Sequence, residues 1–452
     1  MNNEIFREYD IRGNVEKDLT DDVVRSIGRA FGSYMAGLGK KRASICRDCR
    51  LSSEHYRDLL VETMVESGLD VTDVGLAPTP LFYYSLFNLD VEGGIMVTGS
   101  HNPPTMNGFK VAVDKSTIYG EQIQDIRKII ESERYTRGTG SYGEYKDIVK
   151  DYYGYLRSNI KIGKSFKVVV DAGNGTGGVI ALPIMREFGQ QVTDLFCDMD
   201  GHFPNHFPDP TVERNLVTLR DTIRRERADV GIGYDGDADR IGVVDEQGGI
   251  IWGDYLMLIF ARQILKEHKG GTFVSEVKCS TNLFDDIARR GGVPIMWKAG
   301  HSLIKQKMKE THALMGGEMS GHIFFADRFF GYDDAIYASL RFLEIMEEED
   351  RPVSEFLSDL PRTYSTPEIR IDCADNVKFD VVRELTDLYR SRYPIIDTDG
   401  VRAIFDGGWG LVRSSNTQPI LVLRFEAGTP EGLDRIQSMV NEDLEKIMKK
   451  YR

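Results

Sequence analysis

The chain has 452 residues and a formal net charge of −14, and 41% of its residues are hydrophobic, which is ordinary for a globular protein. The length favours about three domains, each large enough to bury its own core. The acidic balance argues against nucleic acid and membrane surfaces as partners, because both need basic surface, and no run of residues is apolar enough to span a bilayer.

The first unit is predicted to span residues 1–150 as an α/β domain. Pro78 and Pro80 are expected to end one of its strands. The hydrophobic spacing predicts helices over residues 18–37, 55–68 and 122–131, and strands over residues 42–48, 70–75, 95–97 and 110–113.

The five cysteines are scattered, and their odd number favours reduced thiols and a cytoplasmic location, with no signal peptide at the polar opening of the chain. Cys46 and Cys49 form a C-x-x-C pair after the strand at 42–48. No second pair completes a zinc site. We therefore expect no redox or metal role for this pair.

The strand at 95–97 leads into residues 98–104, which read TGSHNPP and cannot form a helix. Ser100 is expected on a rigid, exposed loop just past the carboxyl end of a strand, where α/β sheets bind ligands. A serine beside His101 on such a loop is a candidate covalent nucleophile. A polar turn that only caps the strand explains these residues equally well.

The second unit is predicted over residues 151–252, with strands at 167–171 and 229–233 and a helix at 216–227. Residues 173–178 read GNGTGG and satisfy the dinucleotide-binding pattern G-x-G-x-x-G, with Asp194 and Asp198 near the place of a ribose-binding acid. A tight, closely packed strand–helix turn is the alternative. The two histidines within residues 202–210 are expected to lie in a loop near a domain joint.

The strand at 229–233 leads into a short loop with three alternating carboxylates, those of Asp235, Asp237 and Asp239. All-oxygen ligation suits Mg²⁺. The later glycine and the final glutamate of an EF-hand are absent, so an acidic turn is the remaining alternative. A cation beside an exposed serine is typical of phosphoryl transfer.

The third unit is predicted over residues 253–365 and again alternates strands with polar loops, one of which carries Glu318, Ser320 and His322. Three successive units of this build indicate an internal repeat. Its predicted helices lie at 254–266, 282–290 and 333–349, with a further one opening at 300–302, and its strands at 272–277 and 293–297.

Residues 366–452 differ in character, and their short strands predict a smaller α+β C-terminal domain. Between two strands lie donor-rich residues 413–417, which suit a phosphate clamp, although a plain polar turn is the alternative. The predicted strands lie at 368–372, 400–405, 409–412 and 419–426, and the helices at 377–389 and 431–449.

Together these stretches resemble the α-D-phosphohexomutase superfamily over essentially the whole chain. The family's serine loop T-[AG]-S-H-N-P stands here as TGSHNP, and its metal loop D-G-D-[AG]-D-R as DGDADR. The stretches GEMSGH (317–322), RSSNTQP (413–419) and the opening FREYDIRG (6–13) follow in the family's order. The resemblance implies an α/β fold of four domains around a central cleft, three similar mixed α/β domains and the smaller α+β one. The family also has DAGNGTGG at this place, which favours the turn interpretation, whereas CRDCR departs from its usual GRDGR.

The resemblance implies that Ser100 carries a phosphoryl group and that Mg²⁺ is bound by Asp235, Asp237, Asp239 and a phosphoryl oxygen on Ser100. The group would pass to a hexose phosphate, and the resulting bisphosphate would reorient and return its other phosphate to the serine. The net reaction interconverts hexose 1-phosphate and hexose 6-phosphate. Glucose 1,6-bisphosphate or mannose 1,6-bisphosphate would be the activator, a small sugar phosphate the partner, and the protein a monomer or dimer.

Further roles are carried over by the same resemblance. Lys110 is the first candidate to take or give the sugar hydroxyl proton, and His322 the second. The expected catalytic residues are Ser100, Lys110, Arg12, His101 and His322. The expected substrate-binding residues are Tyr9, Arg240, Lys278, His301, Glu318, Ser320, His322, Arg413, Ser415, Asn416 and Thr417.

Substrate choice rests on Met319, because the GEMSGH form resembles enzymes that use both mannose and glucose phosphates. The GEQSGH form resembles phosphoglucosamine mutases. We therefore expect a phosphomannomutase/phosphoglucomutase. The alternatives are a phosphoglucosamine mutase, a nicotinamide-dependent oxidoreductase and a non-catalytic sugar-phosphate-binding protein.

Overall fold

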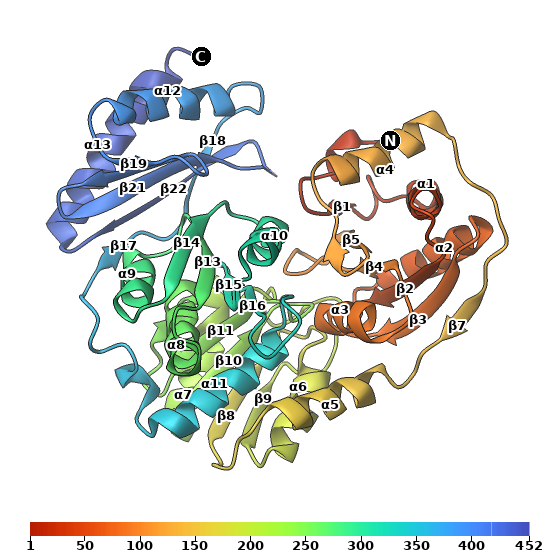
Figure 1. The fold of residues 1–452 in the computed structure, drawn as a ribbon, viewed down its shortest axis with the longest axis horizontal. Coiled ribbons are helices and arrows are strands. Elements are labelled where there is room, and N and C mark those ends of the chain that lie inside the picture. Colours follow the sequence, from red (N-terminus) through yellow and green to blue (C-terminus); the bar gives the residue numbers. More distant parts are fainter. Residues whose placement is uncertain (417, 452) are drawn as a thin grey trace.

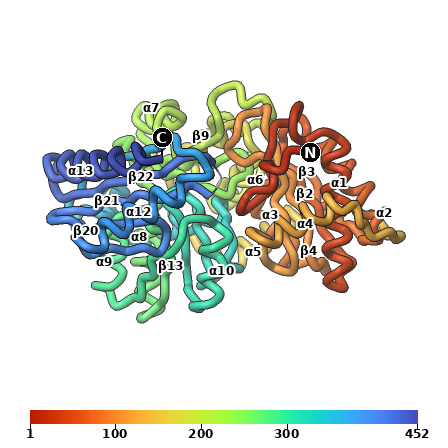
Figure 2. The backbone as a smooth tube through the Cα atoms, turned by 90° about the horizontal axis from the view of Figure 1, so that it is seen from above, coloured from red at the N-terminus to blue at the C-terminus, as the bar shows by residue number. Residues whose placement is uncertain are grey.

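The computed structural model describes residues 1–416 and 418–451, which form four sheets. We call the parts of the chain that carry these sheets domains I to IV. Figure 1 shows domain I in red and orange on one side and domain IV in blue on the other, with domains II and III between them. Figure 2 shows the same order from above, with the first and last domains at opposite ends. The four-domain architecture expected from the sequence is confirmed.

Domain I contains a mixed seven-stranded sheet. Its strands are β1 (Ile11–Asn14), β2 (Arg42–Arg47), β3 (Asp70–Leu76), β4 (Gly93–Val97), β5 (Met106–Val113), β6 (Ser116–Thr117) and β7 (Tyr142–Glu144). Its helices are α1 (Asp21–Gly37), α2 (Ser53–Glu66), α3 (Thr79–Asn88) and α4 (Glu121–Ser132).

Domains II and III contain sheets of five and four strands. Domain II comprises α5 (Ile148–Asn159), β8 (Lys167–Asp171), α6 (Gly178–Glu187), β9 (Gln191–Leu195), α7 (Val217–Glu226), β10 (Val230–Tyr234), β11 (Ile241–Asp245) and β12 (Ile250–Ile251). Domain III comprises α8 (Gly253–Glu267), β13 (Thr272–Glu276), α9 (Thr281–Arg289), β14 (Val293–Trp297), α10 (His301–Thr311), β15 (Met315–Gly317), β16 (Ile323–Phe325) and α11 (Ala335–Glu349).

Domain IV is an antiparallel six-stranded sheet with two helices on one face (Figure 1). It comprises β17 (Tyr364–Ser365), β18 (Ile369–Asp372), α12 (Lys378–Arg390), β19 (Ile395–Ile396), β20 (Val401–Phe405), β21 (Gly408–Ser414), β22 (Ile420–Ala427) and α13 (Pro430–Met448). Thr417, one of the expected phosphate-binding residues, lies outside the described residues.

Domains I to III repeat one topology, so the predicted internal repeat is confirmed. Four consecutive strands lie side by side as β5-β4-β2-β3, β11-β10-β8-β9 and β16-β15-β13-β14. In each set the last strand in the chain runs antiparallel to its neighbour and the others are parallel. The turn into that last strand carries Ser100 in domain I, the three aspartates in domain II and Glu318 in domain III. The repeat therefore supplies three equivalent loops to the candidate site.

The sequence prediction missed helices α3 and α5 and several short strands, among them β9 and β11, and it shortened β5. Helix α3 begins at Thr79, where the prolines were expected only to end a strand, because Pro80 lies in the first turn, where an N–H has no intrahelical acceptor. Helix α5 was not predicted, and β5 begins at Met106 rather than at Lys110. Part of the opening motif, residues 11–13, belongs to β1, which pairs with β5.

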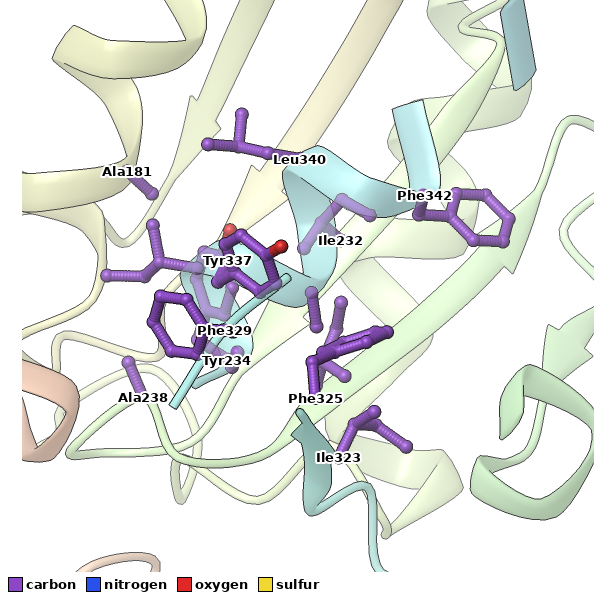
Figure 3. Packing of buried hydrophobic residues seen from close by; sticks show 14 of the residues in the cluster. Ala181, Ile232, Tyr234, Ala238, Ile323, Phe325, Phe329, Tyr337, Leu340 and Phe342 are labelled. Atoms are coloured by element: carbon purple, nitrogen blue, oxygen red, sulfur yellow. The ribbon is translucent and has the colours of Figure 1, made fainter. Parts of the chain in front are cut away.

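Domains I, II and III share a continuous apolar core that joins Met96 of β4, Ile232 of β10 and Phe325 of β16. Figure 3 shows the part of this core around α11, with Tyr337 and Leu340 near Ile232. Domain IV has its own cluster of buried residues. A small patch of Val277, Trp409 and Leu411 joins it to domain III. None of the described helices combines the length and apolar composition needed to cross a bilayer.

Candidate active site

The loop between β4 and β5 holds Ser100 in an uncommon backbone conformation, with a φ of 49°. Such strain in a residue other than glycine is concentrated at functional sites. The Ser100 N–H donates to Thr98 Oγ1 at 2.9 Å, and its hydroxyl donates to Asp235 Oδ2 at 2.8 Å. The ring of His101 places Nδ1 3.1 Å from the same hydroxyl. Only 2% of Ser100 is exposed, so the expected exposed loop is wrong: the loop of domain II covers the serine.

Arg50 organises the serine loop, and the sequence analysis missed it. The side chain is buried, and its Nε lies 3.2 Å from Asp48 Oδ2. Its two Nη groups donate four hydrogen bonds, at 2.6 to 2.9 Å, to the carbonyls of Ser100, Asn102, Pro103 and Met106. The guanidinium also lies 4.9 Å from the ring of Phe203 in domain II. In the sequence, Arg50 is the last residue of CRDCR, which was interpreted only for its two cysteines.

The three aspartates of the loop between β10 and β11 are buried, and their carboxylate oxygens lie within 4.8 Å of one another. Asp235 Oδ1 accepts the N–H groups of Asp239 and Arg240 at 3.0 and 3.1 Å. Asp237 Oδ1 is buried without a hydrogen-bond partner among the described residues. An unpartnered carboxylate oxygen in an all-oxygen group fits a hard divalent cation such as Mg²⁺.

Gly236 allows the two loops to meet through their backbones. A Cβ at this position would lie 2.5 Å from the Ser100 carbonyl oxygen, closer than van der Waals contact permits. Any side chain here would therefore push the aspartates away from the serine. The glycine of the D-G-D-x-D motif therefore has a steric role beside the ligand-binding role of the aspartates.

Lys110 of β5 reaches into the same group of carboxylates. Its Nζ donates to Asp237 Oδ2 at 2.8 Å and forms an ion pair with Asp239. Burial lowers the pKa of Lys110, but the charges of Asp237 and Asp239 outweigh it and hold the pKa well above the usual value. Burial and the neighbouring charges of Asp239 and Asp237 raise the pKa of Asp235. Lys110 is therefore a protonated donor in this arrangement.

His322 connects domain III to the aspartates. Its Nδ1 donates to Glu318 Oε2 at 2.8 Å, and its Nε2 lies 3.2 Å from Asp239 Oδ1. Burial lowers the pKa of His322, but the charge of Asp239 and the bonds to both carboxylates raise it to about 9. Arg240 Nε lies 3.0 Å from Nε2 and works against protonation. The two carboxylates favour the protonated ring, because one faces each nitrogen, whereas the N–H that Arg240 Nε directs at Nε2 opposes it.

The pKa of His101 is lowered, in contrast to that of His322. Burial lowers it well below the usual value, and the charges of Arg240 and Arg12 lower it further. The neutral ring can accept a proton at Nδ1, beside the Ser100 hydroxyl. The site thus places a neutral imidazole next to the serine and the charged Lys110 beside Asp237 and Asp239.

Tyr9 joins domains I, III and IV through one hydroxyl. It donates to the Ala299 carbonyl at 2.9 Å and accepts from Asn416 Nδ2 at 3.0 Å. Its ring lies 5.8 Å from that of His301. Gly300 makes room for it, because a Cβ there would lie 2.4 Å from Tyr9 Cζ. The main chain of Gly300 also donates to Glu318 Oε1 at 2.7 Å, which ties Tyr9 to the loop of domain III.

In domain IV, Arg413 Nε donates to Asp399 Oδ2 at 2.9 Å, and this carboxylate also accepts the Ala299 N–H at 3.0 Å. Ser415 is buried, and its Oγ accepts the Gln418 N–H at 3.1 Å. The described part of the expected clamp therefore faces domain III. The distance between these domain IV residues and Ser100 therefore depends on how domain IV packs against domain III.

Three further expected residues form no hydrogen bond in the structure with the described serine or aspartates. Arg12, whose charge acts on His101, pairs with Asp10 at 2.5 Å, and its buried Nε has no hydrogen-bond partner among the described residues. Lys278 Nζ donates to Glu368 Oε2 at 3.0 Å. Ser320 is half-buried at the turn between β15 and β16.

The glycine-rich turn at 173–178 packs against the metal loop. A Cβ on Gly175 would lie 2.6 Å from the Gly236 carbonyl oxygen, which accepts the Thr176 N–H at 3.0 Å. This contact matches the packing interpretation of GNGTGG. Burial raises the pKa of Cys46 and Cys49, the latter to about 12, so neither thiol is poised to ionise.

Comparisons with known proteins cover all four domains. Residues 3–137, 146–249 and 252–364 match the family models "Phosphoglucomutase/phosphomannomutase, alpha/beta/alpha" domains I, II and III, and residues 368–443 match the C-terminal domain. A Pseudomonas aeruginosa phosphomannomutase/phosphoglucomutase is 45% identical over 444 residues, 98% of this chain and 96% of the relative. A Neisseria meningitidis serogroup A phosphoglucomutase is 42% identical over 447 residues, 98% and 97% of the two chains. The crystal structure of a Burkholderia thailandensis phosphoglucomutase/phosphomannomutase family protein superposes with a TM-score of 0.93 at 40% identity, covering 99% and 98%.

Proposed function

The chain belongs to the phosphoglucomutase/phosphomannomutase family of α-D-phosphohexomutases and interconverts hexose phosphates, and we propose that it does so through a phosphoserine at Ser100. The reaction would pass a phosphoryl group between Ser100 and O1 or O6 of a hexose by way of a hexose 1,6-bisphosphate. The observation that carries this proposal is the 2.8 Å hydrogen bond from the strained, buried Ser100 hydroxyl to Asp235 within the group of three carboxylates.

Asp235, Asp237 and Asp239 would hold Mg²⁺ together with a phosphoryl oxygen on Ser100. When bound, the cation supplies neutralisation of charge on the transferring phosphoryl group. The unpartnered Oδ1 of Asp237 supports this ligand set. Phosphoryl transfer needs little other covalent assistance, so positioning and charge carry most of the catalysis.

The proton-handling groups follow from the arrangement of charges. When Ser100 attacks the bisphosphate, its proton has two acceptors within reach, Asp235 Oδ2 and His101 Nδ1. Lys110, which is protonated and paired with Asp237 and Asp239, is the proposed donor to a departing sugar oxygen and takes the proton back in the reverse direction. His322 is the second such group, with its charge held by Glu318 and Asp239.

Recognition of the substrate would be divided between domains. Glu318 and Ser320 would bind ring hydroxyls, and Arg240, Lys278 and His301 would line the sugar. The distal phosphate would be held by Arg413, Ser415, Asn416 and Thr417, with Tyr9 beside them. A loop that reads O3 and O4 but ignores C2 would accept glucose and mannose alike, and Met319 supports this choice over glucosamine.

Domain IV is proposed to act as the lid that excludes water during transfer. Its separate core and its small apolar patch with domain III support this role. The Tyr9–Asn416 bond would be one contact of the closed state. Free cysteines in the described residues support the proposed cytoplasmic location.

Phosphorus NMR tests the proposed reaction directly. The protein is mixed with Mg²⁺, a trace of glucose 1,6-bisphosphate and, in separate tubes, glucose 1-phosphate, mannose 1-phosphate or glucosamine 1-phosphate. We expect the 6-phosphates of glucose and mannose to accumulate without inorganic phosphate, and Ser100→Ala to abolish the conversion. Release of inorganic phosphate would refute the mutase reaction, and fastest turnover of glucosamine 1-phosphate would refute the substrate choice.

A further inference from the structure

A further pocket lies between domains I and III. The three aspartates do not line it, although Lys305 in its wall pairs with Asp333, which lies beside Asp239. The pocket has a volume of about 230 Å³ and is formed by α3, the segment from Lys115 to Gln122, α10 and the turn before α11. Its inner wall includes Tyr83 and Tyr332, which are 2% and 3% exposed. Its outer wall includes exposed Lys115 and Lys309. We refer to it as the interdomain pocket.

The charge of the interdomain pocket is opposite to that of the chain. Three lysines line it, and none of its described lining residues is acidic, although the protein has 71 acidic and 57 basic residues. Lys305 is paired on its inner side with buried Asp333, at 3.1 Å. Lys309 contacts Ser116, and Lys115 Nζ lies 5.2 Å from the Phe87 ring centroid. Lys115 and Lys309 therefore face the pocket from different domains without a carboxylate in its wall.

The pKa of Lys309 is lowered, as expected in a pocket that gathers positive charge. Burial lowers its pKa and the charge of Lys305 lowers it further, while Asp114 alone works in the other direction. A bound anion would relieve the repulsion between these ammonium groups. The net acidic protein thus keeps a site where negative charge is stabilising.

The floor of the interdomain pocket is aromatic. The ring centroid of Phe87 lies 5.0 Å from that of Phe330 and 5.7 Å from that of Tyr332. The rings of Tyr83 and Tyr332 are 5.3 Å apart. Such a floor favours a flat apolar ligand, because aromatic rings pack edge-to-face or offset-stacked against one another.

The volume limits the size of the ligand. A cavity of about 150 Å³ holds one benzene molecule, and pockets for drug-sized ligands start at about 300 Å³. The interdomain pocket, at about 230 Å³, lies between these sizes. One aromatic ring with one acidic substituent fits this volume.

We propose that the interdomain pocket binds a small aromatic anion, with its ring on the aromatic floor and its acidic group between Lys115 and Lys309. The ligand would bridge domains I and III. These domains already touch there through Thr117 Oγ1 and Ser302 Oγ, which are 3.1 Å apart. Because α10 also begins at His301, the ligand would brace the helix that enters the active site.

Fluorine NMR tests this site with 4-fluorobenzoate as the anionic probe and 4-fluorobenzamide as its neutral counterpart. The test variant is Lys115→Ala/Lys309→Ala, which removes two exposed charges. The matched control is Lys307→Ala on the same helix, whose Nζ lies 4.2 Å from the Trp297 ring centroid. Titrations are repeated in the presence of excess glucose 1-phosphate.

We expect 4-fluorobenzoate to bind the wild type and the Lys307→Ala variant alike, and to raise the Tm of both. Loss of the two lysines should raise its Kd about tenfold, as should replacement of the probe's carboxylate by the amide. Glucose 1-phosphate should leave the binding unchanged. Equal affinity in the double variant, equal affinity of the two probes, or displacement by glucose 1-phosphate would each overturn the proposal. Because binding is measured without turnover, failure here leaves the mutase assignment untouched.

Discussion

Replacement of Arg50 isolates the effect of positioning the serine loop from the chemistry of the site. All four Nη hydrogens of Arg50 are used by loop carbonyls, and Asp48 balances the charge. Arg50→Ala would leave these buried carbonyls without a partner, at about 1–3 kcal/mol each, and Asp48 without a cation. That sum approaches the roughly 5–15 kcal/mol that holds a whole domain together, so the alanine variant threatens folding. Arg50→Lys is the better test, because it keeps the charge beside Asp48 and is less of a threat to folding.

Lysine keeps the positive charge beside Asp48 but offers three hydrogens from one nitrogen in place of a planar fork. At least one of the four carbonyls of the loop loses its partner, at a cost of about 1–3 kcal/mol in stability. Ser100, held at a strained φ of 49°, would then relax away from Asp235. A displacement of about 1 Å can lower a rate about 100-fold, or about 2.7 kcal/mol in the activation barrier. We expect kcat to fall by about this factor and KM to change little, because the proposed site for the distal phosphate lies in domain IV.

The assay couples glucose 6-phosphate formation to its dehydrogenase and measures kcat and KM, with circular dichroism and Tm reporting on the fold. Arg57→Lys is the matched control, because Arg57 also pairs with a buried carboxylate of domain I, that of Asp73. It should retain wild-type kcat. A folded Arg50→Lys variant with kcat within about threefold of the wild type would refute the positioning argument.

Three further predictions address the metal, the distal phosphate and pH. Removal of Mg²⁺ by EDTA should abolish turnover, and Asp237→Asn should raise the Mg²⁺ concentration for half-maximal activity at least about tenfold; an unchanged requirement would contradict the ligand set. Arg413→Ala should raise KM about 10–100-fold by removing a charge-assisted bond, while phosphorylation of Ser100 by a bisphosphate persists in part; an unchanged KM would count against the clamp. Burial lowers the pKa of His206, but the bond to Asp171 outweighs it and raises the pKa above the usual value of about 6.5, so its stabilising contribution is full below that pH and lost as pH rises through the raised pKa. His206→Asn should therefore flatten the decline of Tm above about pH 6.5, and parallel Tm curves for the two proteins would show the pair to be unimportant.

The chemistry of the loops could be predicted from the sequence because it depends on residue type at short spacing. Asp235, Asp237 and Asp239 are two positions apart, so any tight turn brings their carboxylates near one cation. The same holds for the strand-then-loop order of each unit, which hydrophobic runs reveal locally. The alternative interpretation of GNGTGG could not be excluded in this way, because the contact of Gly175 with Gly236 joins residues far apart in the chain.

What the tertiary structure alone decided is which distant groups meet and in which charge state. Arg50 reaches carbonyls more than forty positions away, and Tyr9 meets Asn416 across almost the whole chain; no periodicity marks such pairs. The burial of Ser100 comes from a loop of another domain, and the opposite pKa shifts of His101 and His322 come from charges on three domains. Residue identity and local spacing determine which groups are available for chemistry. The burial and charge state of each group depend on the residues packed around it. Those residues come together only when the four domains assemble.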